Sequence, residues 1–249
     1  MLIWPWKKTQ EEKETRPERE ASKQNLLWCP EAIIPDLKMK TRGKYPQKYP
    51  EGAVVHYTAS PEDPTGILNW AREMGYCYFV IDRVGRIYQS FPLDEWGYHA
   101  GESSYLGRTG VSKYFVGIEI VSAGRLQPVP SKETGVETKY AAWFHYVGNT
   151  TVLKQNAKLY SRDQVRVCET TMNIRAGTYH KYTPQQEESL LGLCLWLKHN
   201  NPDVFSFANV VGHDEVAPGR KQDPGGSLST TMNVFRQKLE SAYSGYLIS

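Results

Sequence analysis

The sequence predicts an α/β fold in which a mixed central β-sheet is flanked by helices. Apolar strand-like runs alternate along the chain with segments of helical periodicity, which is typical of a sheet with helices on its faces. One pair of runs, 76–81 and 86–91, is separated by a short turn that contains Gly85, so we expect an antiparallel hairpin within the sheet. No internal repeat interrupts the alternation.

In the first half of the chain, regular structure is expected to begin at residues 26–28. Residues 53–57 are predicted to form a buried strand that ends in a histidine and a tyrosine. An Asp-Pro pair and helical spacing predict a helix over 63–75, closed by a glycine. Residues 115–121 are predicted to form another strand, in which Glu119 interrupts an apolar run.

In the second half, the clearest signal is a helix that starts after Thr183. Thr183 stands at the N-cap, a proline follows, and Gln186 completes a capping box. Asn201-Pro202 is expected to end this helix. Its predicted buried stripe is Leu190, Leu191, Cys194 and Leu197.

The last elements predicted are a strand over 208–211 and a closing amphipathic helix over 231–243. Four residues of that helix are expected to face the core: Val234, Phe235, Leu239 and Ala242. Residues 122–182 lack a clean period, and we interpret them as an elaboration inserted into a single domain that spans 25–249.

Residues 1–24 are predicted to be a charged arm, either a solvated helix or a flexible segment, because their polar composition cannot bury a core. The N-terminus has no apolar h-region and no small-residue cleavage site, so we expect synthesis and folding in the cytoplasm without a signal peptide. No apolar run approaches the roughly 20 residues of a membrane span, so membrane insertion is not expected.

Composition narrows the function only slightly. The 249 residues carry a net charge of +3, which permits attraction to an anionic polymer but does not argue for nucleic acid. The four cysteines form no C-x-x-C pair, which argues against a zinc ribbon. Their spacing allows two disulfides, and we favour buried free thiols. The oligomeric state is not predicted.

A loop over 212–225 concentrates reactive side chains. His213, Lys221 and Asp223 lie in it among prolines and glycines that exclude a long helix or strand. Catalytic zinc takes three protein ligands and keeps an open position for water. If the strands before His56 and His213 are neighbours, these histidines and Asp223 converge at one sheet edge. On their own, two histidines and an aspartate this far apart in sequence are more often a core histidine, a surface histidine and a turn aspartate.

Three segments resemble zinc-dependent N-acetylmuramoyl-L-alanine amidases of the type-2 amidase and peptidoglycan-recognition superfamily. They occur in the order found in that family, and together with their surroundings they cover roughly 50–121 and 183–243. They are His56-Tyr57-Thr58-Ala59, the central stretch from Tyr98-His99-Ala100-Gly101 to Ile118-Glu119-Ile120, and the loop from His213 to Gly225.

The resemblance implies Zn²⁺ as cofactor, with His56, His213 and Asp223 as its ligands. It implies hydrolysis of the amide between N-acetylmuramic acid and L-alanine, with peptidoglycan or muropeptides as the bound partner. Glu119 is then expected to be the general base, with a pKa raised by partial burial, and Lys221 the oxyanion stabiliser. The alternatives are an outward-facing glutamate on a half-exposed strand and a solvated loop lysine.

The remaining residues of the resemblance have less defined roles. Tyr57 and His99 are expected to contact substrate, and His99 alternatively to support a metal ligand. Cys77 occupies the position at which some lytic members carry a tyrosine, so it is either a fourth zinc ligand or, as we favour, a buried thiol. This departure increases the weight on Glu119. Arg220 is expected to be solvated.

Three functions fit these observations. The leading one is a phage endolysin-like enzyme that lyses the cell wall after release through a holin-type lesion. A cytoplasmic amidase that recycles muropeptide fragments, and a peptidoglycan-recognition module that binds without catalysis, are the alternatives. The presence of all three ligands, Glu119 and Lys221 argues against pure binding.

Overall fold

A five-stranded mixed sheet forms the centre of the fold in the computed structural model, which describes residues 26–60, 63–129, 137–142, 144–147, 150–153 and 157–248. The strand order is β15-β2-β8-β3-β4, with the first four strands parallel and β4 antiparallel to β3. The sheet strands are β2 (Gly52–Tyr57), β3 (Phe79–Ile81), β4 (Ile87–Tyr88), β8 (Phe115–Ile120) and β15 (Val210–Gly212). The predicted mixed α/β class, including the β3–β4 hairpin, is therefore confirmed.

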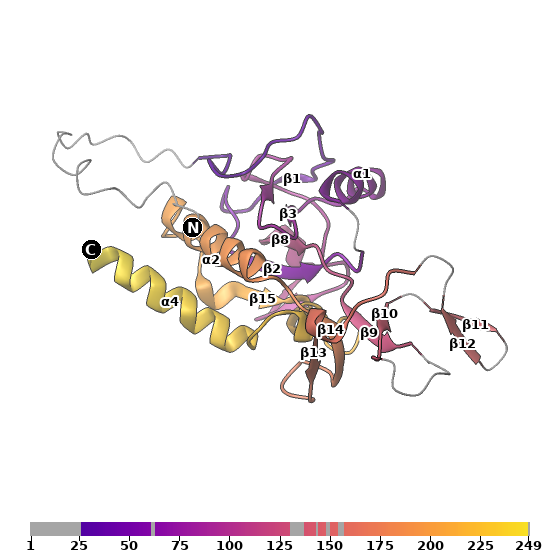
Figure 1. Ribbon diagram of the computed structural model, residues 1–249. Helices are drawn as coiled ribbons and strands as arrows, with labels where there is room; N and C mark the ends of the chain where they lie inside the picture. The colour runs from indigo at the N-terminus through magenta and orange to yellow at the C-terminus, as the bar shows by residue number, and fades with distance from the viewer. Residues whose placement is uncertain are drawn as a thin grey trace.

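Three long helices cover this sheet, and their caps agree with the sequence signals. They are α1 (Pro64–Met74), α2 (Pro184–Asn200) and α4 (Met232–Ile248). Asp63 caps α1 by accepting hydrogen bonds from two backbone amides, and the Thr183 side chain accepts from the Gln186 amide at the start of α2. Helices α2 and α4 run side by side, whereas α1 lies beside β3 and away from them (Figure 1).

The buried faces of α2 and α4 differ from the prediction at three positions. Leu193 is fully buried on α2, and the predicted Leu191 is only partly buried against the same core. Val234 on α4 is 40% exposed and Ala242 is only partly buried, while Phe235 and Leu239 are buried as expected. Which side of a helix is buried depends on the neighbouring elements as well as on the helix's own periodicity.

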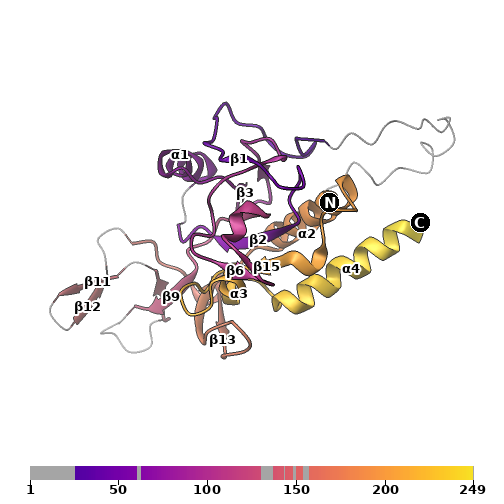
Figure 2. The same cartoon turned by 180° about the vertical axis from the view of Figure 1, so that it is seen from behind.

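The inserted segment forms a second sheet at one end of the molecule, away from the C-terminal end of α4 (Figure 2). Its strand order is β10-β9-β14-β13, entirely antiparallel. A separate hairpin pairs β11 with β12. The strands are β9 (Arg125–Pro128), β10 (Tyr140–Ala141), β11 (Phe144–Val147), β12 (Thr150–Leu153), β13 (Val165–Cys168) and β14 (Gly177–His180).

The inserted segment leaves and rejoins the core at a single place. The Ser122 hydroxyl donates to the carbonyl oxygen of His180 at 2.8 Å, and the His180 Nδ1 accepts from the Ala123 amide at 3.1 Å. The His180 amide donates to the Gly124 carbonyl at 2.8 Å. The entry and exit strands of the insertion are thus tied together beside the end of β8.

Short elements complete the described chain. The expectation that regular structure begins at 26–28 is wrong, because these residues form no strand or helix and their side chains are largely exposed. The predicted arm over 1–24 lies outside the described residues. The short elements are β1 (Gly43–Lys44), β5 (Glu95–Trp96), β6 (Ser104–Tyr105), β7 (Arg108–Thr109), α3 (His213–Val216) and the 3₁₀ turns η2 (Val111–Lys113), η3 (Arg162–Gln164), η4 (Phe207–Asn209) and η5 (Gly225–Ser227).

The segment on either side of β15 differs from the sequence-based prediction. The predicted strand over 208–211 is a 3₁₀ turn followed by β15, and the loop after it begins with the four-residue helix α3.

All four cysteine thiols are unpaired, so the chain has no disulfide at these positions. Among the described helices, none is both long and apolar enough to cross a membrane.

Candidate metal centre

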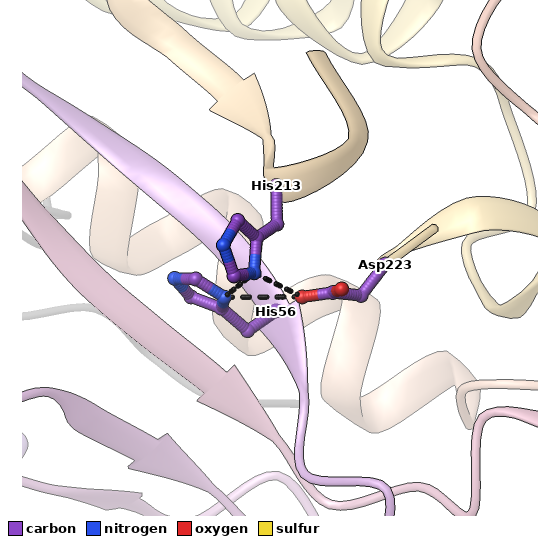
Figure 3. A group of neighbouring side chains, drawn as sticks. All are labelled: His56, His213 and Asp223. Atoms are coloured by element: carbon purple, nitrogen blue, oxygen red, sulfur yellow. Dashed lines mark hydrogen bonds and ion pairs between the residues drawn. The ribbon is translucent and has the colours of Figure 1, made fainter. Parts of the chain in front are cut away.

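Three buried side chains meet at one point at the edge of the central sheet (Figure 3). His56 Nδ1 lies 2.8 Å from His213 Nδ1 and 3.1 Å from Asp223 Oδ2, and His213 Nδ1 lies 2.9 Å from the same carboxylate oxygen. Each residue is at most 6% exposed. Among the described residues, this trio is the one group of histidine, cysteine and acidic side chains arranged to hold a metal ion.

The sheet topology brings the trio together. Strands β15 and β2 are adjacent and parallel, so their carboxyl ends lie at the same edge. His56 stands near the end of β2, and His213 opens α3 directly after β15. The Asp214 amide donates to the Asp223 carbonyl at 2.8 Å, which folds the loop back so that the Asp223 carboxylate faces the histidines.

Backbone carbonyls determine which ring nitrogen of each histidine is free. His213 Nε2 lies 3.0 Å from the Ala100 carbonyl oxygen, to which it can only donate. His99 Nε2 likewise donates to the Phe115 carbonyl at 2.9 Å, so His99 Nδ1 accepts from His56 Nε2 at 3.1 Å. Both His56 and His213 therefore turn Nδ1 toward the Asp223 carboxylate, and in the neutral tautomer of each ring that atom can bind a metal ion.

This donor set fits a cation. Two ring nitrogens and a carboxylate oxygen converge within 3.1 Å of one another, which is the arrangement that the ligands of a single ion need. Two imidazole nitrogens and one carboxylate oxygen are a ligand set typical of catalytic zinc. Histidines oriented by carbonyls or by another side chain are also typical of metal ligands.

The pKa shifts favour the ligand forms of these groups. Burial lowers the pKa of His56 to about 4, helped by the proximity of His213 and opposed by Asp223. Burial acts to raise the pKa of Asp223, but hydrogen bonds from His213 and His56 outweigh it and hold that pKa below its usual range. At neutral pH the trio therefore has a neutral His56 and an ionised carboxylate.

Glu119 lies beside the trio on the neighbouring strand. It is the register partner of His56 across the β2–β8 pair, so both side chains point to the same face of the sheet. Its Oε2 is buried and has no hydrogen-bond partner within the described structure. Burial raises the pKa of Glu119 to about 8; the charge of Asp223 adds to the rise and Lys221 opposes it.

The other residues singled out in the sequence are distributed around this centre. Lys221 is half-buried, and its charge acts on both His56 and Glu119. The ring of Tyr57 packs against Gly124, at the start of the inserted segment. Cys77 is 2% exposed and belongs to the apolar core, and it is not a member of the trio.

Several contacts around the centre were not anticipated. Arg220 is exposed, as expected, and its guanidinium also donates to the carbonyl oxygens of Ala100 and Glu102. The Ala100 oxygen accepts from His213 as well. The buried Tyr182 hydroxyl donates to the His56 carbonyl at 3.0 Å. Only a long-range contact defines these roles, so no local pattern in the sequence indicates them.

The comparison with family models gives one match. A family model described as N-acetylmuramoyl-L-alanine amidase matches residues 46–226. No curated protein sequence matches the chain.

Two solved structures with a TM-score of 0.50 share the fold, and a third is similar. The endolysin N-acetylmuramoyl-L-alanine amidase LysCS from Clostridium intestinale superposes with a TM-score of 0.50 at 18% identity, over 85% of this chain and 96% of that chain. The amidase LysC from the same organism gives 0.50 and 18%, over 85% and 98%. AmiD from E. coli, solved with an anhydro-muramyl peptide, gives 0.49 and 22%, over 82% of this chain and 62% of that one.

Proposed function

The chain belongs to the N-acetylmuramoyl-L-alanine amidase family, and we propose that it uses zinc to hydrolyse the amide between N-acetylmuramic acid and L-alanine in peptidoglycan. The observation that carries the proposal is the convergence of His56, His213 and Asp223, whose free donor atoms lie within 3.1 Å of one another. Glu119, on the same face of the sheet, supplies the acid–base group that such a hydrolysis needs.

His56, His213 and Asp223 would hold the ion. When bound, zinc lowers the pKa of a water molecule toward about 7 and polarises a carbonyl group. The Ala100 carbonyl accepts from His213 Nε2, and His99 contacts His56 Nε2, so both ligand rings have Nδ1 turned inward. His99 acts through His56, since it fixes that ring and is itself fixed by the Phe115 carbonyl.

Glu119 is the proposed general base and general acid. Its carboxylate takes a proton from the attacking water and returns it to the nitrogen of L-alanine as the amide bond breaks. A pKa of about 8 in a buried position is close to the operating pH, where both transfers are efficient. The unpartnered Oε2 leaves one oxygen free to contact water or the leaving amine.

Lys221 is the proposed oxyanion stabiliser. Its ammonium group acts electrostatically on both Glu119 and His56, and it forms no ion pair with the acidic groups of the described structure. A cation at that place favours the negative charge that develops on the carbonyl oxygen in the transition state. Tyr57, half-buried beside Asp223, is proposed to contact the substrate.

One assay tests the proposal. Purified full-length protein is incubated with muropeptides, and free stem peptide is sought by mass spectrometry before chelation, after it, and after zinc is restored. We expect release that stops on chelation and returns with zinc. Binding of muropeptides without release would instead support a recognition module.

Two biological roles fit this chemistry, and we infer the lytic one as the leading role. A lytic enzyme acts on polymeric peptidoglycan, as expected of an endolysin, whereas a recycling enzyme acts on small anhydro-muropeptides. The comparison of turnover on intact sacculi with turnover on anhydro-muropeptides separates them. A strong preference for the anhydro-muropeptides would contradict the lytic role.

A further inference from the structure

The inserted sheet contacts the backbone that follows Asp223 in the sequence. One guanidinium nitrogen of Arg166, on β13, donates to the carbonyl oxygens of Gly226 and Ser227 at 3.0 and 3.1 Å. The same nitrogen also reaches the Leu228 carbonyl. These carbonyls begin three residues after Asp223, so Arg166 fixes the backbone immediately beyond the metal ligand.

A second arginine holds the loop on the other side of Asp223. Arg175, in the turn between β13 and β14, donates to the Gly219 carbonyl oxygen at 2.5 Å. The Arg175 carbonyl in turn accepts a hydrogen bond from the Tyr179 hydroxyl at 2.8 Å, which ties that turn to β14. The two arginines therefore bracket the segment 219–226, with the ligand inside it.

The sheet and the loop also meet without space for a side chain. Gly225 has φ +46°, and a Cβ atom built there would lie 2.8 Å from the Tyr179 ring. A Cβ atom on Gly226 would lie 2.4 Å from Cys168 Sγ and 2.6 Å from the same ring. Two consecutive glycines thus allow the loop backbone to lie directly on the inserted sheet.

The core and the loop itself supply the other contacts: Arg220 donates to the carbonyl oxygens of Ala100 and Glu102, and two backbone hydrogen bonds lie within the loop. The Asp214 amide binds the Asp223 carbonyl, and the Lys221 amide binds the Ala217 carbonyl. The Tyr182 amide, at the exit of the insertion, adds a bond to the Ser227 carbonyl at 2.8 Å. The backbone on both sides of Asp223 therefore takes much of its definition from the insertion.

We propose that Arg166 and Arg175 are positioning residues for Asp223, and that the inserted sheet forms the outer part of the metal centre. This inference rests on the proposed function, because it assumes that Asp223 binds zinc. The arginines do not touch the ion; they act by holding the loop at the position where its carboxylate faces both histidines.

The test measures zinc affinity of the full chain by competition with a chromophoric chelator. Groups that orient metal ligands typically contribute 10–100-fold in affinity. We expect Arg166→Gln to weaken zinc binding by about 10–100-fold, and Arg175→Gln, whose side chain is more exposed, by about 3–10-fold. Arg166→Lys keeps one charged donor and is expected to recover part of the loss. Arg162→Gln removes the same charge from an exposed position of the insertion and is expected to bind zinc as the parent does.

Cobalt substitution gives a second readout that a purely structural role would not change. The visible absorption of bound Co²⁺ reports ligand geometry, so Arg166→Gln is expected to alter that spectrum while Arg162→Gln leaves it unchanged. If Arg166→Gln does not fold, Arg175→Gln carries the same two measurements. Unchanged zinc affinity in the folded variants, with zinc bound by the parent, would overturn this inference and leave the amidase proposal standing. A parent protein that does not bind zinc would overturn both.

Discussion

The two halves of the candidate active site are held in different ways. His56 and Glu119 lie on β2 and β8, whose register aligns them side by side. His213, Lys221 and Asp223 lie on α3 and the loop after it, outside any strand. The strand half is positioned by a continuous ladder of backbone hydrogen bonds, whereas the loop half depends on separate contacts from the insertion and from the segment around Ala100.

This difference shows where precision in the site comes from. A residue in a central parallel strand is held in position by backbone hydrogen bonds to both neighbouring strands. A residue in a loop needs side chains from elsewhere to satisfy its backbone carbonyls and limit its motion. The loop half is therefore expected to lose its geometry more readily than the strand half when a contact or the metal is removed.

The largest effect is expected when one ligand is removed from each half. His56→Ala and His213→Ala should both lose stoichiometric zinc, measured by metal analysis after dialysis, because two remaining ligands hold the ion weakly. His199→Ala, at an exposed histidine on α2, is the control and should keep it. Full zinc occupancy in the His213 variant would contradict the ligand assignment.

The next effect separates catalysis from metal binding in the strand half. Glu119→Gln preserves shape but cannot accept a proton, so kcat should fall by roughly 10²–10⁴-fold while zinc content is unchanged. Turnover of muropeptides and metal analysis are measured on the same sample. Glu73→Gln, exposed on α1, should behave as the parent. An active Glu119→Gln enzyme would show that the base lies elsewhere.

In the loop half, Lys221→Met should lower kcat by about 10–10³-fold with a smaller change in KM, because the cation is needed most when the oxyanion develops. Steady-state kinetics on a soluble muropeptide measure both constants. Lys113→Met, at an exposed lysine, is the matched control. A change in KM alone would indicate substrate binding and not oxyanion stabilisation.

Hydrogen exchange compares the two halves directly. Backbone amides in 53–56 belong to the central ladder and should exchange only through global unfolding, with or without zinc. Amides in 217–222 should exchange faster in the metal-free protein, and zinc should slow them, since it ties Asp223 to the strand half. Mass spectrometry of the exchanged peptides reads both. Equal protection in the metal-free protein would break the distinction between the halves.

The smallest effect concerns the place where the insertion joins the core. Burial lowers the pKa of His180 to about 3, with Arg83 and Lys158 adding to the fall. An unfolded histidine has a pKa near 6.5, so between about pH 6.5 and 3 the unfolded chain binds a proton that the folded chain does not. Above about pH 6.5 both states are unprotonated at this residue and the folded protein keeps its full stability. As the pH is lowered from 6.5 toward 3, the free energy of unfolding falls by up to about 1.4 kcal/mol per pH unit for this proton.

Urea unfolding at pH 7 and pH 5 measures this slope. His180→Asn removes the titrating group, so the fall between the two pH values should become smaller than in the parent. An equal slope in the His180 variant would assign the pH dependence to other groups.

The sequence predicted the central strands and the long helices well, because their signals are local. A buried run that ends in His56 and the capping box at Thr183 each depend on a few adjacent residues, and both appear in the structure. Glu119 is a different case: alternation alone allows either face of the sheet, and only the register with β2 places it beside His56.

The inserted sheet was not predictable in this way. Its central pair joins β9 to β14, about fifty residues apart, and neither strand has a distinct pattern of its own. The contacts of Arg166 and Arg175 depend on that long-range pairing, so these two arginines carry no sequence signal. The partial exposure of Leu191 and of Val234 depends on the neighbouring elements, which periodicity cannot define.

The junction at Ser122 and His180 has a consequence for engineering. Because the chain departs and returns through bonded neighbours, the distance between the end of β8 and the start of α2 is set at this junction and not by what lies beyond it. The outer hairpin of β11 and β12 could then be shortened, or exchanged for a foreign peptide, without re-tuning the central sheet. The natural limit for such a graft is β13 and β14, whose arginines must remain. The fold therefore offers an attachment point for new recognition elements on the inserted segment.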